Sequence, residues 1–397
     1  MIDEYETLRI LGGKAYVRPA VLDSISTISG IIFDCDGVLI DASRSYGKSI
    51  GLTVSYLMGK ITGRIFPSSF VSPKMIHSIR KSGGFNNDWN TAYVILLKLL
   101  SSLPDNLSGS YLVRFEAATA RSPTDPYARL EHVAVEGSES KIPRVLFNSL
   151  KKSSDTVISF AANLDEKGIG TAERLVIDTA KGKTKKMLRS FKSLLPYPSK
   201  VGRGILNTVF DEFFYTSRLF KKVHGVGRRL RLSREGRNGF IENEDLLVKE
   251  KTLKLLSARF GKKGIGIASG RGSVATLYTL NSLTKYLNSS AMVFLEDIDS
   301  EELAKKDLGK PSPYSLLRAA ESIPNNSSIL YVGDSAEDLL MANNAKSQRA
   351  GTQRFLFAGI HGTSHSPTES LAIFQNGRAD IVLKSVNDLP AVLGAGN

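Results

Sequence analysis

The chain has 397 residues, 42% hydrophobic and 23% charged, with a formal net charge of +14, which is the profile of a soluble globular protein of two or three domains. A single cysteine, Cys35, excludes an internal disulfide, and no apolar stretch approaches the ~20 residues that a membrane helix needs. Because the acidic amino terminus is also unlike a signal peptide, we expect a cytoplasmic protein that does not engage a membrane. Cys35 lies between two aspartates, which invites a redox interpretation, but we expect a small buried residue on the opposite strand face.

The first informative element is a short apolar run, Ile31-Ile32-Phe33, that ends at Asp34; the preceding residues 1–28 carry no chemical signature. An uncharged run of this kind is typical of a buried strand in a parallel sheet. Asp34 would then stand at the carboxyl edge, where open α/β sheets bind ligands. Side chains two apart in an extended segment point to the same side, so Asp36 can share a pocket with Asp34 before Gly37 allows a sharp turn.

A long insertion follows, from Asp41 to roughly Asn243, and it interrupts the core between its first and second strands. Its opening part, Ser45 through Leu100, favours helices. Between about Ser101 and Lys200 proline, glycine, serine and charges break the periodicity, and no elements are predicted there. We therefore expect a discontinuous core of residues 1–42 and 247–397, and an inserted domain of residues 43–246 with an extra basic insertion near 101–200.

The positive charge is concentrated in the insertion. Residues 141–235 contain 21 Lys and Arg against 8 Asp and Glu, a net charge of +13, with clusters at 181–186 and 228–231. Such clusters could steer a multiply anionic substrate or bind nucleic-acid phosphates, or they could be the solvated surface of a heat-stable protein. No nucleic-acid-binding motif accompanies the charge and aromatic residues are not interleaved with it, which disfavours nucleic acid as a partner without excluding it.

Apolar runs alternate with helical patterns in the last third of the chain, which predicts a parallel βαβ sheet. The predicted strands are 264–268, 292–295, 329–332, 355–357 and 380–383, and the predicted helices are 273–287, 313–320, 336–345 and 388–393.

Three segments in this part carry further polar groups. Ser269 follows a predicted strand and offers a hydroxyl, while Gly270 adds an amide at a predicted helix start, which favours anions. Lys310, within Gly-Lys-Pro, supplies a fixed positive charge. Asp334 follows another buried run and offers a second carboxylate to a metal ion. Asp338, four residues on, could bind the ion through water or hold Asp334 in place.

These residues suit one chemistry. A carboxylate attacks a phosphate monoester poorly, because both are negative and the leaving alkoxide needs a proton. A hard dication neutralises the phosphate charge, and magnesium prefers one or two carboxylates together with waters and phosphate oxygens. The segments therefore predict a magnesium-assisted phosphoryl-transfer site built around an aspartate nucleophile.

The order of these motifs resembles that of the haloacid dehalogenase (HAD) superfamily: Asp-x-Asp-Gly, then Ser or Thr, then Lys, then Gly-Asp-x-x-x-Asp. The resemblance implies a doubly wound, Rossmann-like parallel sheet and an aspartyl-phosphate intermediate, with Asp34 as nucleophile and Asp36 as general acid and base. It also implies that Asp34, Asp334 and the backbone carbonyl of Asp36 hold Mg²⁺, and that Ser269 and Lys310 bind the phosphoryl oxygens.

The insertion resembles a cap placed between the first and second motifs, as in subfamily IA, where a lid over the site excludes water and selects the substrate. The stretch Gly83–Trp89 resembles a Gly-Gly-Phe-Asn-Asn-Asp-Trp segment of an uncharacterised branch of the superfamily, together with Ser45-Tyr46. As a substrate loop it could present Arg80, Asn86 and Asn87. The alternative is a helix start capped by Asn87 or Asp88, with Trp89 in the core of the insertion.

Three functions remain open from the sequence. The first is a phosphatase that acts on a small phosphorylated metabolite. The second is a phosphomutase with the same core, which would return the phosphoryl group to a sugar. The third is a nucleic-acid-binding protein that uses the basic insertion. The oligomeric state and the particular phosphate ester are not predicted.

Overall fold

The computed structural model describes residues 5–85, 87–134, 143–152, 154–165, 167–195, 197, 199–230, 238–298, 308–364 and 366–395. The chain divides into two compact units, Met1–Ala42 with Glu244–Asn397, and Ser43–Asn243. We call them the core unit and the inserted unit. The sequence predicts a return to the core at residue 247, whereas the core unit resumes at Glu244.

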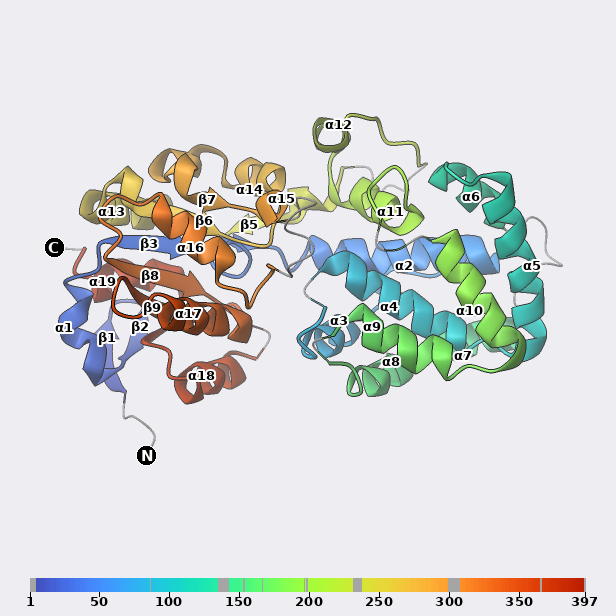
Figure 1. Cartoon of the computed structure of the whole chain (residues 1–397), viewed down its shortest axis with the longest axis horizontal. Helices are drawn as coiled ribbons and strands as arrows, with labels where there is room; N and C mark the ends of the chain where they lie inside the picture. The colour runs from blue at the N-terminus through green and yellow to red at the C-terminus, as the bar shows by residue number, and fades with distance from the viewer. Residues whose placement is uncertain are drawn as a thin grey trace. The chain divides into compact units, whose positions relative to one another are not determined.

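The described part of the core unit contains an eight-stranded sheet with the order β1-β2-β10-β9-β8-β3-β6-β7 (Figure 1). The strands are β1 (Glu6–Ile10), β2 (Gly13–Val17), β3 (Gly30–Phe33), β6 (Ile265–Ala268), β7 (Met292–Val293), β8 (Ser328–Gly333), β9 (Arg354–Ile360) and β10 (Ile381–Leu383). From β10 to β7 all neighbours pair in parallel, which confirms the predicted α/β class.

The amino-terminal hairpin is absent from the sequence prediction. β1 and β2 pair antiparallel with each other, and β2 pairs antiparallel with β10 at the edge of the sheet. The hairpin has little of the regular alternation that marks a strand, since its first strand is largely exposed. The turn between its two strands ends at Gly13, whose φ of 134° is a conformation that glycine adopts more readily than other residues.

The winding of the sheet reverses at β3. Among the parallel strands the chain forms β3 first, then β6 and β7 on one side of it, and then β8, β9 and β10 on the other side. In open α/β sheets such a reversal places a crevice at the carboxyl ends of the central strands, which is where ligands bind. The doubly wound architecture is therefore present, with β3 at the switch point.

Helices cover both faces of the sheet (Figure 1). Ile31 and Phe33 pack in one buried cluster with residues of α13 and α19, while Ile32 packs in the other with residues of α16, α17 and α18. This alternation follows from the two-residue period of a strand and explains why the run is apolar throughout. The helices are α1 (Leu22–Ile25), α13 (Glu250–Phe260), α14 (Ser273–Leu280), α15 (Leu295–Ile298), α16 (Tyr314–Glu321), α17 (Ala336–Gln348), α18 (Pro367–Asn376) and α19 (Leu389–Val392).

Two predicted elements end early, where another element begins. The helix predicted to reach residue 287 ends at Leu280, because Asn281 has a positive φ of 45° and a 3₁₀ segment, η7 (Asn281–Tyr286), follows it. The strand predicted over 292–295 stops at Val293, and α15 begins at Leu295.

A short ribbon joins the two core segments. Strand β4 (Ile40–Asp41), where the chain leaves the core unit, pairs antiparallel with β5 (Asp245–Leu246), where it returns. The backbone amide of Leu247 also donates to the carbonyl of Leu39 at 2.9 Å. Both ends of the insertion are thus fixed to each other within the core unit.

The inserted unit is helical throughout its described residues, as predicted for its first part. Its α-helices are α2 (Tyr46–Thr62), α3 (Pro73–Arg80), α4 (Asp88–Ser101), α5 (Asp105–Arg121), α6 (Pro126–Val133), α7 (Arg144–Lys151), α8 (Ser154–Ala161), α9 (Ile169–Glu173), α10 (Gly182–Leu194), α11 (Ile205–Phe214) and α12 (Ser217–His224). A π-helical segment, η3 (Arg174–Asp178), continues α9.

Six of these helices lie between residues 101 and 200, where the sequence predicts none. Three of the residues that break the periodicity are at helix starts: Pro104 precedes α5, Pro126 is the first residue of α6 and Gly182 is the first of α10. Proline suits a first helical turn, because the amide that it lacks would have no partner there. Among the helices described here, none is long and apolar enough to cross a lipid bilayer.

Candidate active site

Three of the predicted site residues follow neighbouring parallel strands. Asp34 follows β3, Asp334 follows β8 and Ser269 follows β6, and β3 lies between the other two strands. The register places these ends at one level, because Phe33 pairs with a residue near the end of each neighbour. The sheet therefore brings residues from distant parts of the sequence to one edge.

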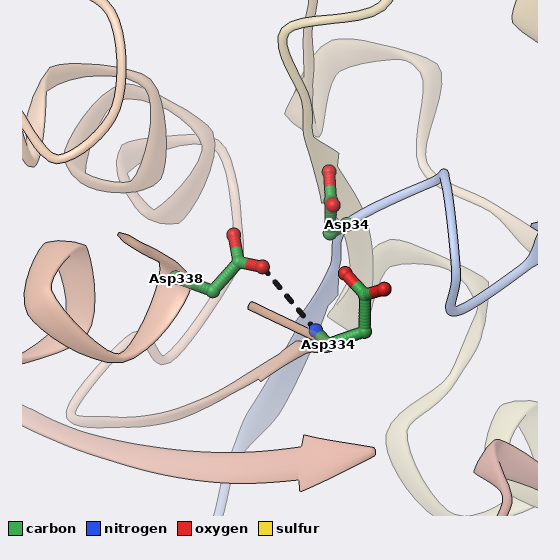
Figure 2. A group of neighbouring side chains, drawn as sticks. All are labelled: Asp34, Asp334 and Asp338. Atoms are coloured by element: carbon green, nitrogen blue, oxygen red, sulfur yellow. Dashed lines mark hydrogen bonds between the residues drawn. The ribbon is translucent and has the colours of Figure 1, made fainter. Parts of the chain in front are cut away.

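Asp34, Asp334 and Asp338 form a compact acidic cluster. One carboxylate oxygen of each residue lies within 4.8 Å of those of the others. Figure 2 shows the carboxylates of Asp34 and Asp334 beside each other, with Asp338 directed at the backbone nitrogen of Asp334, from which it accepts a hydrogen bond of 3.2 Å. Asp338 and Asp34 are buried, so this charge is held away from water.

Both oxygens of Asp338 accept several hydrogen bonds. Oδ2 accepts from the amides of Asp334 at 3.2 Å and Ser335 at 3.1 Å, and from Ser335 Oγ at 2.6 Å. Oδ1 accepts from Lys310 Nζ at 2.6 Å and from Tyr331 Oη at 2.8 Å. These bonds form a capping box at the start of α17 and fix the backbone that carries Asp334.

Lys310 joins the cluster as its cation. Its Nζ lies 2.8 Å from Oδ1 of Asp34 and 2.6 Å from Oδ1 of Asp338. The loop that carries Lys310 is attached to α17, because Asn344 Nδ2 donates to the carbonyl of Pro311 at 2.9 Å. Although burial lowers the pKa of Lys310, Asp338 and Asp34 outweigh this effect and hold the pKa well above its usual value, so the ammonium stays charged.

The other two carboxylates carry more negative charge than Lys310 compensates. Burial raises the pKa of Asp34 to about 6, an effect that Lys310 opposes and that Asp338 and Asp36 increase. Burial, followed by the charges of Asp338 and Asp34, raises the pKa of Asp334 well above its usual value. Adjacent carboxylates with raised pKa values form an environment that a bound cation would stabilise.

Asp36 stands beside this cluster in a tight turn. The amide of Gly37, which has a φ of 76°, donates to the carbonyl of Ile40 at 2.9 Å and closes the turn. The Asp36 side chain is 39% exposed, and its Oδ1 accepts from Nη1 of Arg271 at 2.8 Å. Asp36 is close enough to raise the pKa values of Asp34 and Asp334, so the two aspartates of the first motif do face the same region.

Two charged residues that the sequence did not single out hold Asp36. The other terminal nitrogen of Arg271, Nη2, lies 2.5 Å from Oε2 of Glu244, and both side chains are fully buried. A cation two residues after Ser269, in a segment that leaves a buried strand, could have drawn attention to Arg271. Glu244 has no such signal, because its partner is distant in the sequence.

Ser269 lies at the end of β6, and its Oγ accepts a long hydrogen bond of 3.4 Å from the amide of Arg271. The placement of Gly270 at a helix start is wrong. Helix α14 begins at Ser273 with Gly272 as its cap, so Gly270 is an exposed loop residue and its amide is not part of the first helical turn. In the loop between Ser269 and Ser273, the side chain of Arg271 contacts Asp36.

The residues predicted as a substrate loop have structural partners within the inserted unit. Arg80 forms an ion pair with Asp88, and Asn86 lies outside the described residues. The side chain of Asn87 caps α4 by accepting from the amides of Trp89 and Asn90. The capping alternative is therefore present, and a substrate role for Arg80, Asn86 and Asn87 stays a prediction.

Comparison with known proteins gives matches among solved structures alone. No protein-family model and no curated protein matches the chain. The chain is similar to an X-ray structure of a Northeast Structural Genomics Consortium target, with 19% identity and a TM-score of 0.53 over 92% of this chain and 98% of that one. A second match is described as a haloacid dehalogenase-like hydrolase from Bacteroides fragilis, with 13% identity and a TM-score of 0.37 over 91% and 99% of the two chains. At the identity of the first match, the likeness concerns the fold alone.

Proposed function

We propose that this protein is a magnesium-dependent phosphatase of the HAD superfamily that hydrolyses a small phosphorylated metabolite, with the phosphoryl group held transiently on Asp34. The observation that carries the proposal is the buried contact of Lys310 with Asp34, inside an acidic cluster at the carboxyl ends of the central strands. The first, third and fourth motifs of the resemblance supply the residues of this cluster, and the second supplies Ser269 at the end of the neighbouring strand β6.

The cluster fits a divalent cation of the magnesium type. Hard dications take carboxylate and carbonyl oxygens, and the donors present are oxygens. Asp34 and Asp334 would hold the ion with the backbone carbonyl of Asp36, and their pKa values are raised by burial and by the neighbouring carboxylates to a degree that Lys310 does not offset. When bound, the ion would neutralise the charge of the phosphoryl oxygens.

Asp338 has a different part in this proposal. Because both of its oxygens already accept hydrogen bonds, from Lys310 and Tyr331 on one side and from the Asp334–Ser335 backbone on the other, it acts mainly by holding Asp334 in place. The sequence also left open that Asp338 contacts the ion through a water molecule. In that case an oxygen of Asp338 would have to accept a hydrogen bond from the water in addition to those described.

The proposed reaction has two displacements at phosphorus. A carboxylate oxygen of Asp34 attacks, the ester oxygen leaves with a proton from Asp36, and the phosphoryl group is joined to Asp34. Water then attacks the same phosphorus while Asp36 takes its proton, which releases inorganic phosphate and restores Asp34. Lys310, fixed by Asp338, donates to the phosphoryl oxygens, and Ser269 contributes a hydroxyl at the neighbouring strand end.

The test is a panel of phosphate esters incubated with the protein and Mg²⁺. We expect stoichiometric release of inorganic phosphate from at least one ester, loss of release in EDTA, and none from Asp34→Asn, which keeps the shape of the side chain without its charge. Quenched samples of the wild type should contain a phosphorylated peptide that includes Asp34.

Two other outcomes would indicate a different function. Conversion of a sugar phosphate into its isomer without free phosphate would identify a phosphomutase. Salt-sensitive binding of RNA or DNA, with no turnover of any ester and no phosphorylated peptide, would contradict the proposal in favour of the basic insertion.

A further inference from the structure

The core unit contains a buried chain of charged groups that ends at Asp36. Arg271 bridges two carboxylates, with Nη1 2.8 Å from Asp36 Oδ1 and Nη2 2.5 Å from Glu244 Oε2. Thr279 completes the arrangement, since its hydroxyl donates to Glu244 Oε2 at 2.6 Å and lies 3.4 Å from Arg271 Nη2. These residues come from the turn after β3, the loop before α14, α14 itself and the segment where the chain returns from the insertion.

Arg271 is placed to orient a neighbour and not to bind substrate. Its side chain and that of Glu244 are 0% exposed, so the guanidinium has no surface on which a phosphate ester could lie. A planar guanidinium with two committed nitrogens fixes both the direction and the distance of its partners. Burying two charged groups is costly unless the geometry is well satisfied, so a role in stability alone is a weak explanation for this arrangement.

Asp36 is the exposed end of this chain of groups. Its side chain is 39% exposed, in contrast to its two partners. Its backbone is fixed by a bridge to Ile40 and by the turn at Gly37, so the remaining freedom of Asp36 lies in its side-chain torsions. Within the described residues, Asp36 forms one side-chain hydrogen bond, in which Oδ1 accepts from Arg271. Because the two oxygens belong to one planar carboxylate, this bond also sets the direction of Oδ2.

We infer that Arg271 is a positioning residue for Asp36, and that Glu244 and Thr279 hold Arg271 in the orientation that this task requires. The inference rests on the proposed function, in which Asp36 gives a proton to the leaving group and later takes one from water. A general acid must lie within hydrogen-bond reach of the atom that it protonates. Free rotation of the Asp36 side chain would therefore slow the protonation of the leaving group.

The test compares two esters with Arg271→Lys, which keeps the charge but cannot bridge both carboxylates. p-Nitrophenyl phosphate has a leaving group that departs without a proton, whereas an alkyl phosphate taken from the active part of the panel does not. Because general acid catalysis contributes about 10²-fold or more, we expect kcat/KM for the alkyl ester, which reports the transfer to Asp34 alone, to fall by about that factor. We expect kcat/KM for the nitrophenyl ester to fall by less than about tenfold. The comparison uses kcat/KM because Asp36 also takes part in the second step, which is common to both esters and contributes to kcat.

Two further variants separate positioning from general damage. Glu244→Gln keeps the volume of the side chain and should show the same preference for the nitrophenyl ester in weaker form. The double variant Arg271→Lys with Asp36→Asn should lose no more activity on the alkyl ester than Asp36→Asn alone, because residues that act through one another are not additive. Arg349→Lys is the matched control, since Arg349, which follows the far end of α17 about 17 Å along the helix axis from Asp338, forms an exposed ion pair of 2.9 Å with Glu321.

An equal loss of kcat/KM on both esters, or additive losses in the double variant, would contradict the inference. A crystal structure of Arg271→Lys tests it without activity: the Asp36 carboxylate should leave its present orientation, and an unchanged Asp36 would overturn the positioning role. If Arg271→Lys does not fold, Glu244→Gln serves both measurements. A wild type that hydrolyses no ester would refute the proposed function instead, and the crystallographic comparison would still decide this inference.

Discussion

Gly37 and Asp334 approach each other so closely that a side chain at position 37 would overlap the Asp334 carboxylate. A Cβ atom built on Gly37 would lie 1.9 Å from Oδ2 of Asp334. The first and the last motif of the site are thus in contact across two neighbouring strands. The contact involves the end of a side chain, so an added methyl group would displace the Asp334 carboxylate more than the backbone.

Gly37→Ala is therefore expected to reduce activity more than stability. We predict a loss of kcat of about 10²-fold with a raised Mg²⁺ requirement, because a displacement of about 1 Å in a positioned group has that effect. The matched control is Gly351→Ala: Gly351 has a φ of 83°, similar to the 76° of Gly37, but open space around its Cβ. Both variants carry the strain of a left-handed residue, about 1–2 kcal/mol. Mg²⁺ titrations of activity and urea unfolding of both variants give the comparison, and equal activity in the two would contradict the prediction.

Asp34→Asn should stabilise the metal-free protein at neutral pH. The pKa of Asp34 is raised to about 6 from an ordinary value of 3.8, so its contribution to stability is complete below pH 3.8 and is lost as the pH rises through about 6. Removing the charge should stabilise the fold by on the order of 3 kcal/mol above that pH, at 1.36 kcal/mol per pKa unit. The measurement is Tm in EDTA from about pH 4 to pH 8, with the exposed Asp23→Asn as control. A difference in Tm that does not shrink toward pH 4 would refute this account.

Asp338→Asn should destabilise the protein at neutral pH, in contrast to Asp34→Asn. Burial opposes ionisation of Asp338, but Lys310 and the donors of Ser335 and Tyr331 outweigh it and lower its pKa, so its contribution is present above the ordinary pKa and is lost as the pH falls. An amide would turn its NH₂ group toward hydrogen-bond donors and leave Lys310 with one fewer partner. We expect destabilisation of about 3–5 kcal/mol at neutral pH, the range for breaking a buried ion pair. Urea unfolding at pH 7 measures it, and a variant as stable as the wild type would show that the capping box is not needed.

Cys35 should be inert in the folded protein. Its side chain is fully buried, and burial, with the neighbouring charges of Asp34 and Asp36, raises the pKa of its thiol to about 12. Because the thiolate is the reactive form, alkylation at pH 8 should be far slower than in urea, where the chain is unfolded. Iodoacetamide labelling followed by mass spectrometry provides the rate. Rapid labelling of the native protein would revive the redox interpretation of this residue.

The inserted unit contains its own spectroscopic reporter. Trp89, the one tryptophan of the chain, donates from Nε1 to the buried Asp211 at 3.1 Å, and His224 Nε2 lies 2.9 Å from the same carboxylate. Asp211→Ala leaves buried polar groups without their partner, which costs about 1–3 kcal/mol. Tryptophan fluorescence during urea unfolding should show this loss, with the exposed Asp155→Ala as control. An unshifted midpoint would mean that the groups find other partners.

The sequence was sufficient for the core of the site and insufficient for its surroundings. Asp34, Asp334 and Ser269 could be predicted because each follows a buried apolar run, and parallel strands end at one edge. The partners of Asp36 could not, since a pair such as Arg271 and Glu244 depends on where the chain returns from a long insertion. The sequence up to Leu100 indicated a mostly helical segment, whereas no elements were predicted from there to Lys200, where four of the six helices have eight residues or fewer and leave too few turns to show a period.

The position of β3 has a consequence for biosynthesis. This strand belongs in the middle of the sheet, but its neighbours β6 and β8 are translated only after the whole inserted unit. We expect that unit to collapse on the ribosome while β3 waits as an unpaired apolar segment, since domains fold as units during synthesis and pairings distant in sequence form slowly. Newly made chains would then pass through a stage that is prone to aggregation and served by chaperones, until β8 emerges and encloses β3.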